Sequence, residues 1–306
     1  MGNYLVKRLI SMVITLWFVI TITFFLMHAI PGGPFVREKE LPPEVIEALN
    51  EKYHLDDPLY VQYFDYLKGV LTFDLGPSFK MIGVDVTDLI KKGFPISAKI
   101  GGLAVLFVLL LGVPIGIISA LKQNSVIDYI VTIIATVGVA VPGFVIATMY
   151  IYIFSSKLGA VPSFGLETAK SYIGPVLSLA FFSLAFVMRL MRSSMLEVLG
   201  EDYIRTARAK GLPEFIVIYK HALKNAIIPV ITYIGPMTAA VMTGSFVIEK
   251  IFAIPGMGKY FVESVGNRDY TVLMGTTVFY AGLVIAVILV VDIAYGMIDP
   301  RIKLGE

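Results

Sequence analysis

Long apolar stretches alternate with polar segments along the whole chain. A helix that crosses a bilayer needs about 20 mainly apolar residues, and six runs of roughly that length contain no Asp, Glu, Lys or Arg. The pattern therefore predicts an all-α integral membrane protein with six transmembrane helices. The six runs are Leu9–Ile30, Ile100–Leu121, Tyr129–Ser156, Tyr172–Met188, Ala226–Ile248 and Thr271–Val291.

Two of these runs contain residues that affect how they can cross a membrane. The fourth is short and has Pro175 near its start, so it crosses a bilayer only if its helix continues past Arg189. Pro142 and Gly143 interrupt the third run. Such breaks occur where helices pack together or line a wet cavity, and also as ordinary kinks. Both explanations remain open from the pattern alone.

The polar segment 31–99 has helical periodicity of its own. Apolar residues follow Pro42-Pro43 at helical spacing, which predicts a first helix. Asp57 is a suitable cap for a second helix with Pro58 at its first position. The apolar face of this second helix would consist of Leu59, Tyr60, Tyr63, Phe64, Leu67, Val70 and Leu71. The segment is therefore predicted to be a folded helical vestibule outside the membrane.

The segment 201–225 lies between the fourth and fifth runs and is rich in Lys and Arg. Gly211 suits the left-handed residue after a helix end, and Pro213 suits the first turn of the next helix. We expect a pair of short helices here. The segment either contacts a partner or is a solvated loop whose positive charges set the topology.

Charge and composition narrow the class of protein. The chain is 57% hydrophobic and only 16% charged, against about 25% charged in soluble domains. Its net charge of +2 implies no bulk attraction to nucleic acid. The Lys and Arg distribution favours both termini in the cytoplasm. The predicted organisation is a cytoplasmic N-terminus with the first membrane helix (1–30), the vestibule (31–99), and a five-helix core that includes the cytoplasmic segment 201–225 (100–306).

Residue patterns typical of catalysis are missing from the sequence. There is no cysteine, no phosphate-binding loop of the form G-x-x-x-x-G-K-[ST] and no HExxH motif. His28, His54 and His221 are far apart. The chain is therefore expected to bind no metal or cofactor and to be no enzyme itself. The apolar runs also lack the ionisable residues of an ion-driven carrier, although an ATP-independent channel or carrier stays an alternative.

Several segments resemble one family of membrane proteins. Asp202–Gly211, His221–Asn225 and Pro229 are similar to the coupling segment of importer-type ABC permeases, whose core is Glu-Ala-Ala-x-x-x-Gly. Arg205, Thr206, Ala207 and Gly211 stand at matching positions, in the form typical of the peptide and nickel branch. Further similar segments are Leu41–Val45, Lys52–Leu55, Thr72–Gly76, Gly76–Lys80, Glu249–Gly258, Asn267–Tyr270 and Asp299–Arg301. Of these, Leu41–Val45, Lys52–Leu55 and Gly76–Lys80 most closely resemble the B-type membrane subunit of bacterial oligopeptide importers, and the others resemble the signatures of the whole branch.

The resemblance implies a function and partners. The chain would be the permease subunit that moves oligopeptides across the bacterial cytoplasmic (inner) membrane by alternating access. Nickel and dipeptide import are the alternatives within the branch. Its partners would be a homologous second permease, two ATP-binding subunits, an extracytoplasmic peptide-binding protein and membrane lipid. ATP would be bound by the partner subunits.

The resemblance also assigns the residues that couple to the ATPase. They are Asp202, Tyr203, Ile204, Arg205, Thr206, Ala207, Arg208, Lys210, Gly211 and His221. Within this set, the apolar contact is expected from Tyr203, Ile204 and Ala207. The basic side chains Arg205, Arg208 and Lys210 are expected to pair with acidic groups of the ATPase, or alternatively with lipid headgroups.

Overall fold

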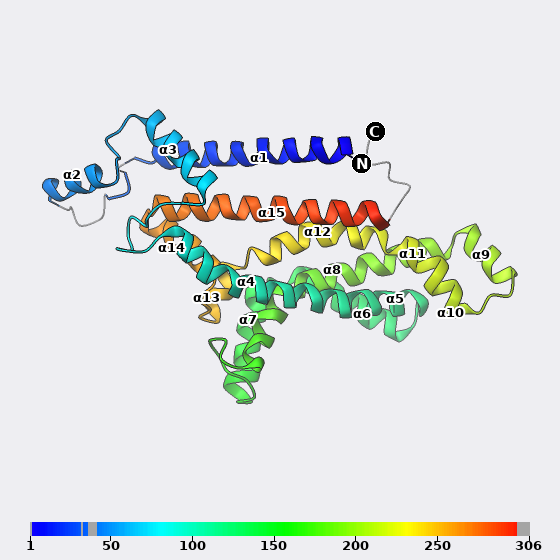
Figure 1. The fold of residues 1–306 in the computed structure, drawn as a ribbon. Helices are drawn as coiled ribbons and strands as arrows, with labels where there is room; N and C mark the ends of the chain where they lie inside the picture. The colour runs from blue at the N-terminus through cyan, green and yellow to red at the C-terminus, as the bar shows by residue number, and fades with distance from the viewer. Residues whose placement is uncertain (1, 32, 36–41, 299–306) are drawn as a thin grey trace. The chain divides into compact units, whose positions relative to one another are not determined.

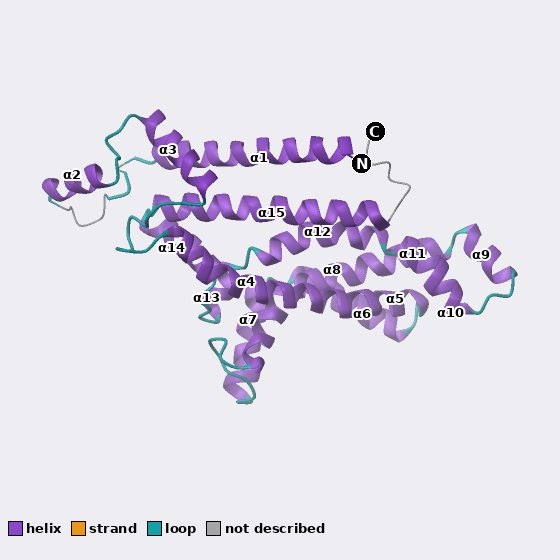
Figure 2. Ribbon diagram, viewed as in Figure 1, coloured by secondary structure: helices purple, strands orange, loops and turns teal. Residues whose placement is uncertain are grey.

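The computed structural model describes residues 2–31, 33–35 and 42–298, and every regular element in these ranges is a helix (Figures 1 and 2). The described residues form two compact units. One unit is built from residues of Met1–Ser97 and Pro255–Ala286, and the other from Ala98–Ile254 and the chain that follows Val287. The all-α prediction is confirmed. The linear division into 1–30, 31–99 and 100–306 remains a prediction.

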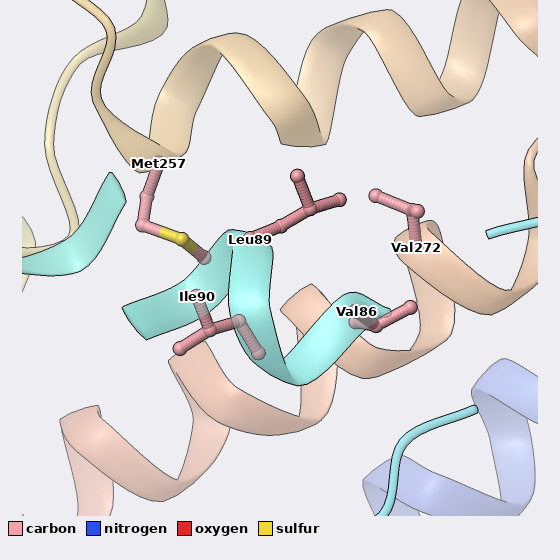
Figure 3. Close-up of a cluster of buried hydrophobic side chains, with 5 residues drawn as sticks. All are labelled: Val86, Leu89, Ile90, Met257 and Val272. Atoms are coloured by element: carbon pink, nitrogen blue, oxygen red, sulfur yellow. The ribbon is translucent and has the colours of Figure 1, made fainter. Parts of the chain in front are cut away.

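The elements of the first unit come from both ends of the chain. They are α1 (Gly2–Ala29), α2 (Pro43–Lys52), α3 (Leu59–Thr72), the start of α4 (Val86–Phe107), α14 (Met257–Asn267) and the start of α15 (Tyr270–Ile298). One of its apolar cores joins α4 to α14 and α15: Val86, Leu89 and Ile90 pack with Met257 and Val272, and all five are buried (Figure 3).

The second unit contains the remaining helices. They are the end of α4, η1 (Val108–Gly112), α5 (Val113–Leu121), α6 (Val126–Ala140), α7 (Gly143–Tyr150), η2 (Ile151–Lys157), η3 (Ala169–Tyr172), α8 (Ile173–Leu199), α9 (Asp202–Ala209), α10 (Glu214–Ile216), η4 (Val217–Ala222), α11 (Leu223–Ala226), α12 (Ile228–Met242), α13 (Phe246–Ile251) and the end of α15. The segments η1, η2 and η4 are π-helical turns, and η3 is a short 3-10 helix.

All six apolar runs form helices, but not all are straight. Four continuous helices are long and apolar enough to cross a membrane: Val6–Ala29, Val86–Leu121, Ala169–Leu199 and Tyr270–Ile293. Two further spans would be bent pairs, Val126–Ala140 with Gly143–Lys157 at 105°, and Glu214–Ala226 with Ile228–Met242 at 49°. The described chain therefore holds four to six candidate spans. The fourth run continues past Arg189 to Leu199, as its length required.

The sharp bend in the third run has a local cause. Val141 is extended (φ −90°, ψ 122°), and Pro142 precedes the first residue of α7 with ψ 143°. A residue before proline is driven out of the helical region by the proline ring, and proline has no N–H to continue the ladder. The break predicted at Pro142 and Gly143 is thus a change of direction between two helices.

Both vestibule helices form as α2 and α3, but the cap of the second differs from the prediction. Pro58, not Asp57, takes the N-cap position, and no side chain caps the helix. Helix α3 begins at Leu59, so Asp57 stands one position before the cap. Its carboxylate instead lies 3.7 Å from His54 Nδ1, while the Gln62 side chain donates to the Asp57 carbonyl at 2.8 Å.

The vestibule helix α3 is attached to α1 through aromatic side chains. Tyr63 and Tyr66 pack around the buried Phe24, and Thr21 and Tyr63 share a hydrogen bond of 2.7 Å. Burial raises the pKa of the Tyr66 phenol well above its usual value. The segment therefore has a folded base and is more than a flexible connection.

Helix α8 packs closely on α5 and α6 in the second unit. A Cβ added to Gly116 would lie 2.7 Å from both the Met188 carbonyl oxygen and Met191 Cβ. One added to Gly138 would lie 2.5 Å from Ala185 Cβ. Small residues let helix backbones approach one another in a membrane. We call the contact of α5 with α8 around Gly116 the glycine seam.

Candidate functional site

The first short helix of the predicted coupling segment ends at a glycine turn. The N–H of Gly211 donates to the Arg208 carbonyl at 2.9 Å, and the N–H of Leu212 donates to the Ala207 carbonyl at 3.4 Å. These are the two hydrogen bonds of a Schellman motif. Gly211 has φ +76°, a conformation that is sterically free only for glycine. The predicted left-handed glycine is confirmed.

A second helix starts directly after this turn. Pro213 precedes α10 with ψ 142°, and α10, η4 and α11 follow without interruption from Glu214 to Ala226. The guanidinium of Arg208 donates to Glu214 at 2.7 Å and 3.2 Å, and so joins the two helices across the turn. The hydrogen bond to this carboxylate raises the pKa of Arg208 above its usual value.

The inner face of α9 is covered by the chain itself. Helix α9 packs on η4, and Ile204 and Ala207 are buried together with Val217. The Asn225 side chain donates to Tyr203 Oη at 2.7 Å. The expectation that Ile204 and Ala207 offer an apolar contact to a partner therefore needs correction: in the folded chain their side chains fill the space between α9 and η4. Tyr203 remains 39% exposed.

The outer face carries the polar residues of the predicted set. Arg205, Thr206, Arg208, Lys210 and Gly211 are exposed. Arg205 donates to Asp202 at 3.1 Å, and the Thr206 hydroxyl donates to the Asp202 carbonyl at 3.0 Å. His221 lies half-buried on η4. Arg205 and Arg208 are thus both exposed and each paired with a carboxylate of the same segment, and Lys210 is exposed beside them.

Two aromatic residues that the sequence interpretation did not select complete this outer surface. Phe215 and Tyr219 are 74% and 65% exposed. Their rings are stacked, with centroids 5.8 Å apart and an interplanar angle of 4°. Because residues i and i+4 share one face of a helix, the spacing itself was visible in the sequence. Large exposed apolar side chains in a polar segment mark a surface that a partner protein or a membrane covers.

The helix that leads into this segment is fixed by a buried ion pair. Arg192 on α8 binds Asp128 on α6 in a bidentate manner, at 2.6 Å from Nε and 2.8 Å from Nη2. Ser119 Oγ and the Asn124 N–H also donate to the Asp128 carboxylate, at 2.6 Å and 2.9 Å. The Asp128 side chain is 3% exposed. This cluster ties α5, α6 and α8 together a few residues before α9 begins.

No metal site accompanies these features within the described residues. No three His, Asp or Glu side chains of that part of the chain lie together in a way that would hold an ion. The surface of 202–226 offers a rigid turn, a basic face and an aromatic pair. Such a surface is suited to binding a protein.

Comparisons with known proteins agree with the sequence resemblance. Residues 112–304 match the family described as "Binding-protein-dependent transport system inner membrane component", and residues 1–98 match the N-terminal model of such membrane components. The chain is 48% identical to the dipeptide transport system permease protein DppB of Bacillus subtilis (strain 168), over 100% of this chain and 99% of that protein. It is 46% identical to the oligopeptide transport system permease protein OppB of Haemophilus influenzae, over 99% of this chain and 100% of that protein.

A solved structure shares the fold. An inward-facing structure of the MetNI methionine ABC transporter matches with a TM-score of 0.53 at 18% identity, over 69% of this chain and 94% of that chain. At this identity the likeness concerns the fold alone. The family models and the full-length relatives show that the chain belongs to the family of binding-protein-dependent transport system inner membrane components.

Proposed function

We propose that this chain is the permease subunit of an ATP-driven peptide importer. The observation that carries the proposal is full-length identity of 43–48% to permeases named for dipeptide and oligopeptide transport. The sequence contains no phosphate-binding loop, so ATP would be hydrolysed by partner subunits. A homologous second permease, two ATP-binding subunits and an extracytoplasmic peptide-binding protein would complete the importer.

Uptake in a strain that lacks only this subunit tests the proposal. Restoring the gene should restore accumulation of labelled di- and oligopeptides, and should leave accumulation of nickel unchanged. Peptides of two to six residues, each at the same concentration, would separate a dipeptide importer from an oligopeptide importer. Restoration of nickel uptake without peptide uptake would overturn the proposal in favour of the metal-importing alternative.

The docking surface for the ATP-binding subunit would be the outer face of 202–226. Phe215 and Tyr219 supply its apolar centre, and Arg205 and Lys210 supply its charge. Aromatic side chains at the centre of an interface commonly account for most of its binding energy, whereas rim charges guide association. The buried Ile204 and Ala207 support this surface from behind.

Co-purification tests the docking surface. Replacing both aromatic residues, by Phe215→Ala and Tyr219→Ala, should remove most of the ATP-binding subunits from the purified permease. A matched control is Phe64→Ala, which removes a ring of similar exposure (64%) from α3. Retention of the ATP-binding subunits by the double variant at the control level would show that they bind elsewhere.

The orientation that this function requires has both termini and 202–226 in the cytoplasm and the vestibule outside. The Lys and Arg distribution supports it. Because the chain has no cysteine, single cysteines at the exposed Thr72 and Gln123 can be labelled in intact cells with an impermeant maleimide. Thr72→Cys should react and Gln123→Cys should react only after lysis. The reverse pattern would invert the proposed topology.

The vestibule would receive the peptide-binding protein. Helix α3 exposes Tyr60 and Phe64, at 66% and 64% of their surface, while its other face is anchored by Tyr63 and Tyr66. A photo-crosslinking amino acid at Tyr60 should capture the binding protein, while the same group at the more distant Gln123 should not. Equal capture at both positions would argue against the vestibule as the receiving surface.

A further inference from the structure

An apolar groove runs along the second unit between α4 with η1 and the start of α8. Its volume is about 350 Å³. Its lining consists of Leu103, Leu106, Phe107, Leu110, Tyr172, Ile173, Val176 and Leu177. Leu106 and Leu110 are 52% and 63% exposed, so the groove is open to its surroundings along its length. We refer to it as the lateral groove.

One end of the lateral groove carries a positive charge. Lys99 Nζ donates to Tyr172 Oη at 3.1 Å and lies 4.4 Å from the centroid of the same ring. Lys99 precedes Leu103, Phe107 and Leu110 on α4 and η1 at intervals that keep them on one helix face. Tyrosine and lysine are typical of the level of the lipid headgroups, where the ring is half in hydrocarbon and the charge reaches polar surroundings. The groove is therefore amphiphilic, with a cation at one end and only apolar lining beyond Tyr172.

The length of the groove corresponds to one leaflet. Leu110 follows Lys99 by eleven positions, which gives about 16 Å along a helix with a rise of 1.5 Å per residue. Half of a hydrocarbon core of about 30 Å is close to the same length. A groove that begins at headgroup level thus ends near the bilayer midplane, as one acyl chain does.

The lining differs from the helix contacts inside the same unit. The glycine seam uses Gly112 and Gly116, where an added Cβ would meet neighbouring atoms at 3.0 Å or less. In contrast, the lateral groove is lined wholly by branched or aromatic side chains. Membrane helices associate through small residues that let backbones approach, so the lining does not favour a partner helix. A peptide would leave backbone N–H and C=O groups without partners among these side chains, at a cost of several kcal/mol each.

We propose that the lateral groove binds an anionic phospholipid, with the phosphate at Lys99 and Tyr172 and one acyl chain along Leu103–Leu110. In the orientation proposed above, this is a lipid of the outer leaflet. The site itself requires only that the chain spans a bilayer, so it stands independently of the cargo. A headgroup phosphate would accept from the Lys99 ammonium and from the Tyr172 hydroxyl, and the apolar lining would exclude water from the chain.

Tryptophan quenching by brominated lipids tests the site in the assembled importer. Trp17 is the chain's one tryptophan, so Trp17→Phe with Phe107→Trp places this chain's one reporter in the groove, and Leu106→Trp gives a second position. The signal of the complex that carries Trp17→Phe alone is subtracted as the contribution of the partner subunits. The complex is placed in nanodiscs of phosphatidylcholine and phosphatidylglycerol, with the bromine on one lipid at a time. Brominated phosphatidylglycerol should reach half-maximal quenching at about a fivefold lower mole fraction than brominated phosphatidylcholine, as expected for one lysine at the membrane surface.

Variants test whether Lys99 is responsible for the preference for phosphatidylglycerol. Lys99→Gln should remove the preference and bring the two lipids to equal mole fractions. Lys157→Gln is the matched control, because Lys157 also lies over a tyrosine ring, 5.5 Å from that of Tyr152, but does not line the groove; it should keep the fivefold preference. Inorganic phosphate, compared with chloride at equal ionic strength, should not displace the lipid if the headgroup is held through its own acyl chain.

Three outcomes would overturn the proposal. Equal quenching by both lipids in the parent would show that no headgroup is selected. If inorganic phosphate removes the preference for phosphatidylglycerol and chloride does not, Lys99 binds the free ion. If neither lipid quenches either reporter in the complex, while both quench them in the isolated subunit, a partner subunit covers the groove.

Discussion

Two glycines in this chain are required for opposite reasons. Gly116 has an ordinary helical backbone, but a Cβ there would collide with Met188 and Met191 on α8. Gly211 has open space around it, with no atom within 4 Å of an added Cβ, but its φ of +76° suits glycine alone. One position is constrained by the neighbouring helix, and the other by its own backbone.

The same two regions contain contrasting arginine–carboxylate pairs. At the glycine seam, Arg192 binds Asp128 at 2.6 Å with side-chain exposures of 27% and 3%. In the coupling segment, Arg208 binds Glu214 at 2.7 Å with exposures of 43% and 54%. The geometry is similar, but water surrounds only the second pair. Exposed pairs commonly contribute about 0–1 kcal/mol, whereas breaking a buried pair costs about 3–5 kcal/mol.

The two regions differ in whether the chain covers its own surface: it does so at the glycine seam but not at the coupling segment. At the seam the chain packs closely against itself, and the adjacent Asp128 carboxylate of α6 is satisfied by Arg192, Ser119 and the Asn124 backbone. The coupling segment keeps its shape through the Gly211 turn and leaves Phe215 and Tyr219 exposed. The seam is therefore expected to control whether the subunit folds, and the coupling segment to control what it binds.

Arg192→Leu should have the largest effect, because it leaves the buried Asp128 carboxylate without its charged partner. The free energy of unfolding should fall by about 3–5 kcal/mol, which would be seen as a large fall in the thermal midpoint of the purified complex. Arg189→Leu is the control, since Arg189 is exposed and donates only to Thr136 at 3.3 Å. The double variant Asp128→Leu/Arg192→Leu should recover much of the loss. Similar midpoints for the two single variants would remove the distinction between buried and exposed charge.

Gly116→Val should have the second largest effect. It should lower the free energy of unfolding by about 1–3 kcal/mol through overpacking, because the backbone of α8 blocks the new side chain. Gly102→Val is the matched control, as an added Cβ at this exposed helical glycine has no neighbour within 4 Å. The yield of monodisperse subunit after detergent extraction measures the difference. An unimpaired Gly116→Val would show that α5 and α8 do not pack as closely as described.

Gly211→Val should cost less in stability, about 1–2 kcal/mol for the left-handed backbone, but should impair coupling. The turn sets the direction of α10, so its distortion is expected to lower transport per ATP hydrolysed while the subunit still inserts. Gly211→Asn is the control, because asparagine tolerates this conformation best among residues with a side chain. Peptide-stimulated ATP hydrolysis in proteoliposomes is the measurement. Equal coupling ratios for the two variants would exclude backbone strain as the cause.

Arg208→Gln should have the smallest effect, no more than about 1 kcal/mol. The loss of stability caused by this substitution should be smaller still at high salt, since ions screen exposed pairs. Measuring the thermal midpoint at about 0.05 M and 0.5 M salt checks this. A loss as large as that of Arg192→Leu would mean that the pair across the Gly211 turn is buried in the assembled protein.

Local sequence signals predicted the elements well. The charge-free runs gave the helices of the spans, the shortness of the fourth run required the continuation of α8 past Arg189, and Gly211 gave the left-handed turn. Each of these features depends on a few consecutive residues. The Asp57 cap was wrong by one residue, because α3 begins at Leu59 and Pro58 takes the cap position.

Features that depend on distant residues were not predictable in the same way. Asp128 and Arg192 are 64 residues apart, and nothing in either neighbourhood indicates that they meet. The covering of Ile204 and Ala207 by the chain depends on where η4 lies, since the apolar face of α9 could equally be covered by a partner. The bend angles of 105° and 49° likewise depend on packing, since a proline marks the site of a break but not its size.

Helix α8 has a mechanical consequence beyond its packing. Its 27 residues correspond to about 40 Å at 1.5 Å per residue, longer than a hydrocarbon core of about 30 Å. The lateral groove lies at its first turns, the Asp128 pair near its last turns, and α9 follows directly. A tilt of this rod by about 10° displaces one end by about 7 Å relative to the other, given its length. A rotation at the coupling segment and an opening at the opposite membrane surface would then both result from one rigid-body movement of α8.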